Sequence, residues 1–185
     1  MPLADHRLVI FARDARANLL LIWETAMIRL TAGALALLLA FAGTSATAQS
    51  GCALPENVNA LATTIASGVN SSRRANGLNQ LEFDRRLSAA AQSHACDMAR
   101  NGLQSHTGSD GSSAKSRARR AGHDDCFVGE SLAWGFPDAN RIVPLWMNSA
   151  GHRQVLLLNG VTKFGIGITQ GPKGPNWVLV VARDC

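Results

Sequence analysis

Four polar side chains occupy sequence surroundings in which they could carry chemistry: His106, Glu130, Ser149 and His152. His106 lies in a loop rich in Gly and Ser, Glu130 interrupts an apolar run, and His152 follows Ala150-Gly151. Two imidazoles and a carboxylate could bind a divalent cation, act as acid and base, or hydrogen-bond one another. Ser149 has no Gly-x-Ser-x-Gly motif around it, so a serine nucleophile is not indicated. The spacing alone leaves the other possibilities open.

Glu130 and the histidines of the chain also have purely structural interpretations. Glu130 could satisfy backbone donors or pair with an arginine, as buried carboxylates usually do. His106 and His152 could hydrogen-bond within their own loops and order them. His94 lies on the inner face of a predicted helix, so we expect a hydrogen-bonded core residue there. His123 follows a glycine expected to end a helix and stands beside acidic residues, so we expect it to be exposed.

The first half of the chain predicts helices that would position these residues. Apolar residues recur at helical spacing over residues 55–75, and Asn76-Gly77 should end that helix. Asp84 is a good N-cap for a second helix ending at Asn101-Gly102, and a short basic helix should run through Arg120. The predicted inner faces comprise Val58, Leu61, Ala62, Ile65 and Val69 in the first helix and Leu87, Ala91, His94, Ala95 and Met98 in the second.

The second half predicts a sheet. Residues 127–135 have the composition of a strand, and residues 140–148 that of a short helix whose first turn must contain Pro144. Residues 164–168 alternate apolar side chains with Gly, a turn rich in Gly and Pro follows, and residues 177–182 return as a second strand. Helices first and a hairpin last indicate an α+β domain in which helices cover the sheet.

The four cysteines, Cys52, Cys96, Cys126 and Cys185, favour two disulfides, since an even number is typical of exported domains. Each disulfide would stabilise the fold by about 2–4 kcal/mol. The chain has no Cys-x-x-Cys pair, so a zinc site built from cysteine is not indicated. Of the three possible pairings we expect Cys96–Cys126 and Cys52–Cys185, the second joining the two ends of the domain.

An export signal is predicted inside the chain rather than at its start. Three acidic residues precede Met27, which is atypical of a signal peptide, whereas residues 30–42 are apolar and Ala46-Thr47-Ala48 is a typical cleavage site. An apolar stretch of 13 residues is shorter than the roughly 20 that span a bilayer, so we expect no membrane anchor. The expected segments are a mis-assigned extension at 1–26, a signal peptide at 27–48 and a single domain at 49–185, exported to the periplasm or the extracellular space.

The charge of the chain argues against nucleic acid as a partner. The full sequence has 18 Lys+Arg and 13 Asp+Glu, and residues 49–185 keep 14 and 10 of these, a net charge near +4. Arg117, Arg119 and Arg120 form a dense basic cluster with no aromatic residues between them. We therefore interpret this cluster as a solvated helix face and expect a monomer with no nucleic-acid partner.

Several sequence blocks follow one another in a defined order: Asn70-x-x-x-Arg74-x-x-Gly77-Leu78, His94-x-x-Asp97-Met98-Ala99, Ser105-His106-Thr107-Gly108, Gly129-Glu130-Ser131-Leu132-Ala133 and Trp146-Met147-Asn148-Ser149-Ala150-Gly151-His152-Arg153. From about Val58 to Ala182 the chain resembles the bacterial branch of the CAP superfamily. This superfamily comprises cysteine-rich secretory proteins, antigen 5 and plant pathogenesis-related proteins, and its domain is also called the SCP domain. The resemblance implies a secreted, disulfide-bonded α-β-α sandwich with a central antiparallel sheet.

The resemblance also implies a cleft. His106 and Glu130 match the His and Glu that face a shared cavity in the family. Ser149 stands where eukaryotic members have a second Glu, and no later Gly-His-Tyr block follows; His152 instead matches the His of the bacterial Ser-Pro-Gly-His-Arg block. A site of His106 and His152, with Glu130 holding a ring N–H or a water, would bind a divalent metal such as zinc weakly.

Three functions are compatible with these residues, because the fold hosts no single chemistry. We favour a binding module, not an enzyme, whose cleft holds a divalent metal, a small apolar molecule or lipid, or a cell-envelope component. The alternative is a metal-dependent or His-assisted hydrolase, a peptidase or esterase, in which Glu130 is the general base. The third is an interaction domain in which the histidines only order loops.

Overall fold

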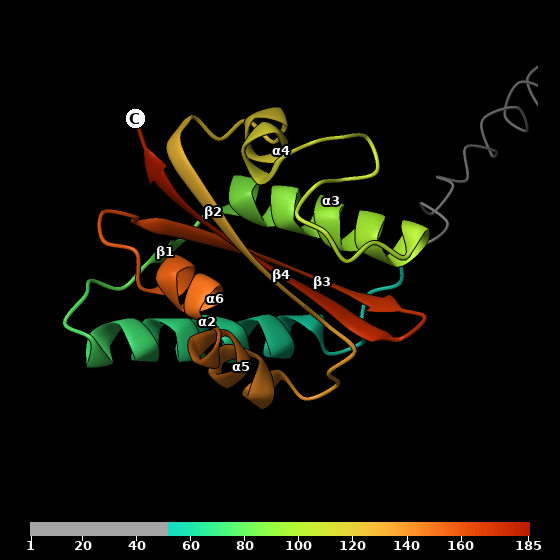
Figure 1. Cartoon of the computed structure of the whole chain (residues 1–185), viewed down its shortest axis with the longest axis horizontal. Helices are drawn as coiled ribbons and strands as arrows, with labels where there is room; N and C mark the ends of the chain where they lie inside the picture. The colour runs from blue at the N-terminus through green and yellow to red at the C-terminus, as the bar shows by residue number, and fades with distance from the viewer. Residues whose placement is uncertain (1–51) are drawn as a thin grey trace, which may run out of the picture. The chain divides into compact units, whose positions relative to one another are not determined.

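A four-stranded sheet lies between two layers of helices in the computed structural model, which describes residues 52–185 (Figure 1). Helices α3 and α4 cover one face, and α2, α5 and α6 cover the other. The helices are α2 (Val58–Ala75), α3 (Arg85–Asn101), α4 (Ala114–Arg120), the 3-10 helix η1 (Ala139–Arg141), α5 (Ile142–Asn148) and α6 (Ala150–Leu156), and the strands are β1 (Glu82–Phe83), β2 (Asp125–Trp134), β3 (Lys163–Gly171) and β4 (Gly174–Asp184). The α-β-α sandwich is confirmed, while the extension and signal peptide predicted for residues 1–48 lie outside the described residues.

The strand order is β1-β3-β4-β2, and β4 pairs antiparallel with both of its neighbours. The predicted hairpin is confirmed, with Gly171 opposite Gly174 at its turn. Strand β1 was not predicted, because two residues are too few to show a period; it pairs in parallel with the start of β3. The sheet is therefore antiparallel apart from one short edge strand.

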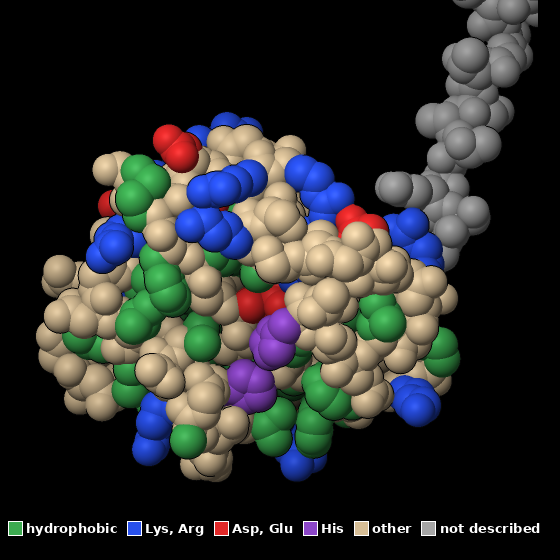
Figure 2. Space-filling model, turned by 45° about the horizontal axis from the view of Figure 1, so that its top comes forward, with side chains coloured by type: hydrophobic (Ala, Val, Ile, Leu, Met, Phe, Trp, Pro, Cys, Tyr) green, Lys and Arg blue, Asp and Glu red, His purple; other side chains and the backbone are tan. Residues whose placement is uncertain are grey.

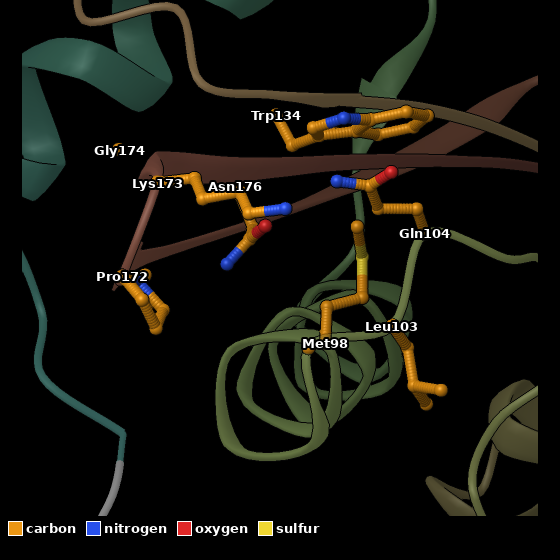
Figure 3. Close-up of a pocket in the computed structure, with 10 residues that line it drawn as sticks. Met98, Leu103, Gln104, Trp134, Pro172, Lys173, Gly174 and Asn176 are labelled. Atoms are coloured by element: carbon orange, nitrogen blue, oxygen red, sulfur yellow. The ribbon is translucent and has the colours of Figure 1, made fainter.

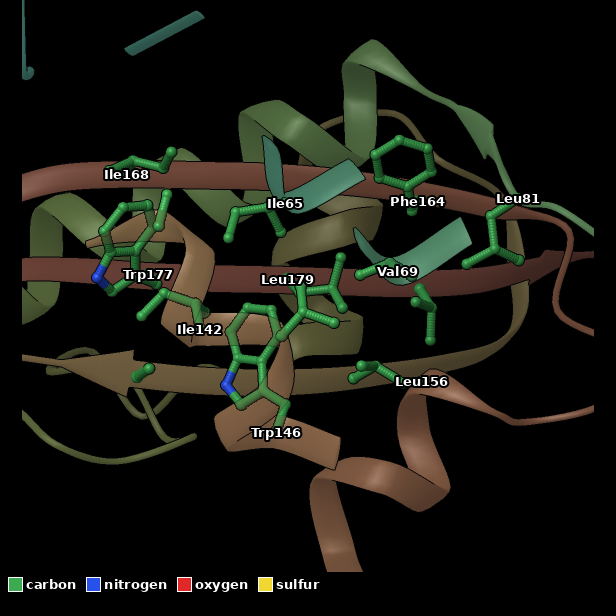
Figure 4. Close-up of a cluster of buried hydrophobic side chains, with 14 of the residues drawn as sticks. Ile65, Val69, Leu81, Ile142, Trp146, Leu156, Phe164, Ile168, Trp177 and Leu179 are labelled. Carbon is green, nitrogen blue, oxygen red and sulfur yellow. The ribbon is translucent and has the colours of Figure 1, made fainter. Parts of the chain in front are cut away.

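Strand β4 separates two hydrophobic cores. Its side chains alternate between the faces, as strand geometry requires, and those of both faces are buried. Figure 4 shows the core on the side of α2 and α5, where Trp146 and Trp177 pack with Ile65 and Leu179. Residues Trp177, Leu179 and Val181 belong to this core, and Val178, Val180 and Ala182 belong to the core under α3.

Helix α2 is joined to the following loop and to the end of α6 by two polar side chains. The Asn70 amide accepts a hydrogen bond from the Leu81 N–H at 2.8 Å and donates to the Leu81 carbonyl at 3.1 Å. Arg73 is buried and donates to the carbonyls of Asn79, Leu156 and Leu158. These bonds replace the water that a buried guanidinium would lose, so a charged residue is accommodated in this layer.

Helix α3 begins and ends where the sequence predicts. The Asp84 carboxylate accepts hydrogen bonds from the N–H groups of Arg86 and Leu87, and Gly102 ends the helix with a φ of 63°. These are the usual N-cap and C-terminal features of a stable helix.

The backbone of α3 lies directly against β3. A Cβ atom added to Gly165 would collide with the backbone of Leu87 and Ser88, and one added to Gly167 would collide with Ala91 and Gln92. Only glycine permits such an approach of helix and strand, because it lacks a Cβ. The alternation of glycine with apolar residues in this segment therefore serves helix packing.

Two side chains of α3 also complete the outer edge of β3. Ser88 accepts a hydrogen bond from the Ile166 N–H at 3.0 Å. Gln92 accepts from the Ile168 N–H at 3.0 Å and donates to the Ile168 carbonyl at 3.1 Å. Because these edge groups are already bonded, this part of the sheet edge is closed to pairing with another chain.

The disulfide prediction is wrong in its pairing. Cys52 pairs with Cys96 and Cys126 with Cys185, with Cα atoms 4.9 and 4.8 Å apart. Antiparallel pairing of β2 and β4 brings the start of one beside the end of the other, where Asp125 is opposite Asp184. The start of the domain is therefore tied to α3, and the end of the chain is tied to β2.

His123 is also placed differently from the prediction. Its side chain is fully buried, because the chain turns inward after α4 to enter β2, and its Nε2 lies 3.2 Å from an Asp184 carboxylate oxygen.

Among residues 52–185, no helix combines the length and the apolar character needed to cross a bilayer.

Gly167→Ala should destabilise the protein by more than about 3 kcal/mol, because the added methyl group meets helix backbone that cannot move aside. Gly151→Ala in α6 is the control, since its Cβ would meet nothing within 4 Å and alanine favours helix by roughly 0.5–1 kcal/mol. Urea unfolding followed by circular dichroism measures both. Equal stability of the two variants would contradict the packing described here.

Peptide mapping of the oxidised protein should recover Cys52 linked to Cys96 and Cys126 linked to Cys185. Digestion under non-reducing conditions and mass spectrometry distinguish these peptides from the alternatives. Recovery of a Cys96–Cys126 peptide as the main product would contradict the observed strand pairing.

Candidate functional site

Glu130 of β2 lies at the centre of a buried polar cluster. Its side chain is 3% exposed, and both carboxylate oxygens are hydrogen-bonded. His106 Nδ1 donates to Oε1 at 2.9 Å, and Arg117 donates to Oε2 at 2.7 Å. The buried charge is therefore compensated by an arginine, which is one of the structural roles considered for this residue.

Arg117 comes from α4, and its position corrects the prediction of a solvated basic face. Its side chain is 4% exposed, whereas those of Arg119 and Arg120 are 62% and 59% exposed. Arg117 also donates to the Ser112 carbonyl at 2.7 Å and to the His106 carbonyl at 3.2 Å. The basic cluster thus has two parts, and only the two exposed arginines form a solvated face.

Two residues of α3 hold the loop that carries His106. Asp97 accepts hydrogen bonds from the Ser109 N–H at 2.8 Å and from the Ser109 hydroxyl at 2.6 Å. His94 is fully buried and donates from Nε2 to the Ser105 carbonyl at 2.9 Å, which confirms its prediction as a hydrogen-bonded core residue. Burial lowers the pKa of the His94 imidazole. The loop is therefore anchored on both sides of His106.

His106 and His152 meet at the surface above Glu130. The His106 side chain is 60% exposed, and its hydrogen bond to Glu130 raises the pKa of its imidazole. Burial lowers the pKa of His152, and so does the nearby charge of His106. Figure 2 shows two histidine side chains side by side on this face, with an acidic side chain next to them. The pKa values of the two imidazoles are therefore shifted in opposite directions.

An apolar pocket of about 290 Å³ opens beside the two histidines. Apart from the imidazoles and Gln104, its walls are aromatic and aliphatic: Leu132, Trp134, Phe136 and Leu145. Mostly apolar walls with a few polar groups are typical of small-molecule sites. Ser149 lies between α5 and α6 and is not among the described residues that line this pocket.

The donor set fits an open and weak metal site rather than a closed one. Among residues 52–185, no three His, Cys, Asp or Glu side chains stand together as a metal-binding group. His106 uses Nδ1 to bond Glu130, so its Nε2 is left for a ligand, and His152 supplies the second imidazole. A carboxylate behind a metal-binding histidine is a common arrangement that orients the ring. Glu130 therefore has the role of an orienting group.

Hydrolysis with Glu130 as the general base is less well supported by this geometry. A general base must reach the proton that it removes, within hydrogen-bond distance or through one water. Both oxygens of Glu130 are bonded to Arg117 and His106, and the side chain is almost fully buried. The base in such a reaction would have to be a histidine.

Two contributors to this site, Arg117 and Trp134, were not identified as site residues from the sequence. Strand alternation contained a signal for Trp134, because Glu130, Leu132 and Trp134 lie two residues apart and so share one face of β2. Arg117 carried no such signal, since only the packing of α4 on β2 brings it to Glu130.

Bacterial proteins of known structure share this fold. An outer surface protein from Borrelia burgdorferi superposes with a TM-score of 0.65 at 23% identity, covering 70% of this chain and 96% of that one. An extracellular protein containing an SCP domain from Bacillus anthracis superposes with a TM-score of 0.60 at 25% identity, covering 68% of this chain and 41% of that one.

Two proteins of Bacillus subtilis are similar in sequence. The uncharacterized membrane protein YlbC is 35% identical over 92 residues, which are 50% of this chain and 27% of that protein. The uncharacterized protein YkwD is 28% identical over 116 residues, 63% of this chain and 45% of that protein. The chain thus spans less than half the length of either relative.

A family model gives the clearest result. The model of the cysteine-rich secretory protein family, CAP, matches residues 67–182, which include β2, most of the hairpin and both histidines of the site. The protein therefore belongs to the cysteine-rich secretory protein family and, with its bacterial relatives, to the bacterial branch of the CAP superfamily.

Proposed function

We propose that this protein is an exported binding module whose histidine pocket holds a divalent metal weakly, with room for an apolar ligand group beside it. The observation that carries this proposal is the chain of hydrogen bonds from Arg117 through Glu130 to His106. It fixes the His106 ring and leaves its Nε2 free beside His152. Two imidazoles at the rim of an apolar pocket form a polar anchor next to a hydrophobic surface.

Binding is favoured over hydrolysis because both carboxylate oxygens of Glu130 are already hydrogen-bonded. Glu130 compensates a buried arginine and orients His106, so releasing it to act as a base would leave the Arg117 charge buried without a partner. When bound, a divalent metal would polarise a ligand oxygen, and the residues of this chain would orient and enclose that ligand. The apolar walls would limit its access to water.

The disulfides of the domain support export of the protein. The domain contains two disulfides, which persist in oxidising compartments and are rare in the cytosol. The predicted signal peptide at residues 27–48 agrees with this, and the related Bacillus anthracis protein is described as extracellular. We therefore infer that the protein acts in the periplasm or outside the cell.

Zinc titration by calorimetry on protein purified after export tests the proposal. We expect saturable one-to-one binding that is lost in His106→Ala and His152→Ala. Glu130→Gln should weaken it by about 10–100-fold, because the His106 ring is then held less firmly. Glu82→Gln is the matched control, since it makes the same chemical change on β1, at the opposite edge of the sheet from β2.

Absence of saturable zinc binding in the wild-type protein, with folding verified by circular dichroism, would overturn this proposal. Zinc-dependent turnover of an ester or peptide by the wild-type protein would instead support the hydrolase.

The pKa of His106 provides a separate check on the hydrogen-bonded chain. Its value should lie above the ordinary range for histidine in the wild-type protein and should fall in Glu130→Gln, since the neutral amide no longer stabilises the imidazolium. Because the folded-state pKa is raised, the stabilisation is complete below the unfolded pKa and is lost as pH rises through the folded value. NMR titration of the imidazole measures both proteins, and an unchanged pKa would contradict the bond.

A further inference from the structure

Trp134 differs from the other two tryptophans of the described chain. Trp146 and Trp177 are each 1% exposed, and their indole N–H groups donate to the carbonyls of Leu132 and Phe136. Trp134 is 37% exposed, and its indole N–H has no hydrogen-bond partner within residues 52–185. Packing and hydrogen bonding therefore account for two of these indoles and leave Trp134 without a structural role of that kind.

A second pocket, of about 100 Å³, lies on the other side of Trp134 from the histidines. Trp134 and Gln104 line both pockets and so form a shared wall between them. In Figure 3 the Trp134 ring lies on one side of this pocket and the Met98 side chain on the other, and the amides of Gln104 and Asn176 point between them. The two pockets adjoin at the exposed indole, and we refer to them together as the groove.

The small pocket is lined by three polar side chains, those of Gln104, Lys173 and Asn176. Asn176 is 7% exposed, and within the described residues its amide forms no side-chain hydrogen bond. Gln104 and Lys173 are exposed, and Lys173 forms no ion pair with any residue of 52–185. No side-chain atom of Asn176 or Gln104 is among the fully buried polar atoms of the described chain that lack a hydrogen-bond partner, so both amides remain accessible from the pocket. Two amides offer both donors and acceptors, which complement an amide group on a ligand.

The hairpin holds these groups in position. The Gly135 N–H donates to the Pro175 carbonyl at 3.0 Å, so the residue after Trp134 is tied to β4 one residue before Asn176. A Cβ on Gly174, whose φ is 101°, would approach the Gly135 backbone. These backbone contacts tie the hairpin turn to the end of β2.

We infer that this groove binds an N-acetylated oligosaccharide of the cell envelope, with one sugar ring on Trp134 and its acetamido group in the small pocket. The flat indole face, which is electron-rich, suits the C–H groups on the apolar face of a sugar ring. Asn176 and Gln104 would bond the acetamido group, and Met98 would contact its methyl group. This inference rests on the proposed function as a binding module and names its ligand class.

Lys173 indicates that the oligosaccharide carries acidic groups. Its side chain lies at the hairpin turn and reaches toward the same pocket (Figure 3). A carboxylate on a neighbouring sugar would form a charge-assisted bond with it. A carboxylate-bearing amino-sugar polymer is therefore expected to bind more tightly than a neutral one.

NMR spectroscopy of exported, uniformly ¹⁵N-labelled protein tests the inference with a defined probe, the β-1,4-linked tetramer of N-acetylglucosamine. We expect the indole signal of Trp134 to shift with saturable dependence on the tetramer, while the buried Trp146 and Trp177 signals stay in place as internal controls. Trp134→Ala should weaken binding at least tenfold. Phe83→Ala is the matched control, since it removes another exposed aromatic side chain, 60% exposed on β1, at the opposite edge of the sheet from β2.

Two further variants separate the contacts. Asn176→Ala should abolish the preference for the acetylated tetramer over the glucose tetramer. Lys173→Ala should weaken binding of the acidic disaccharide of N-acetylglucosamine and N-acetylmuramic acid but not that of the neutral tetramer.

Lack of a Trp134 shift, an equal shift with the glucose tetramer, or a shift with decanoate but not with the oligosaccharides would overturn the inference. Zinc binding in Asn176→Ala tests the histidine site separately, because Asn176 lines the small pocket and not the histidine pocket, so failure of one proposal is distinguishable from failure of the other.

Discussion

The close contact between α3 and β3 is the constraint on which the rest of this structure depends. Gly165 and Gly167 let the helix backbone lie against the strand, and Ser88 and Gln92 then close the strand's outer edge. The same helix carries the residues that anchor the His106 loop and one half-cystine. The position of the site is thus fixed by contacts of backbone with backbone, which cannot adjust as side chains do.

The buried carboxylate of Glu130 joins three elements that would otherwise meet only through apolar packing. It links β2 to α4 through Arg117 and to the loop through His106. A charge buried at this depth requires an opposite charge beside it. If either member of the ion pair is removed, the remaining charge stays buried without compensation. The cluster therefore orients one imidazole at the surface.

The two pockets follow from the geometry of β2 and the hairpin. Glu130, Leu132 and Trp134 share one face of the strand, so a buried carboxylate, a buried apolar side chain and an exposed indole follow one another along it. The turn of β3 and β4 then adds Asn176 and Lys173 on the far side of Trp134. The amides and the cation of the small pocket thus lie on one side of Trp134, and the histidines lie on the other.

The sequence by itself determined the elements whose signals are local. Helical periodicity, the Asp84 cap and the alternation of the C-terminal hairpin depend on neighbouring residues, and the ordered sequence blocks identified the family and placed His106, Glu130 and His152. Only the tertiary structure decided the disulfide pairing, the burial of His123 and Arg117, and the groove around Trp134. These depend on strand register and on which helix packs against which strand, and those contacts join residues far apart in the sequence, where no local pattern records them.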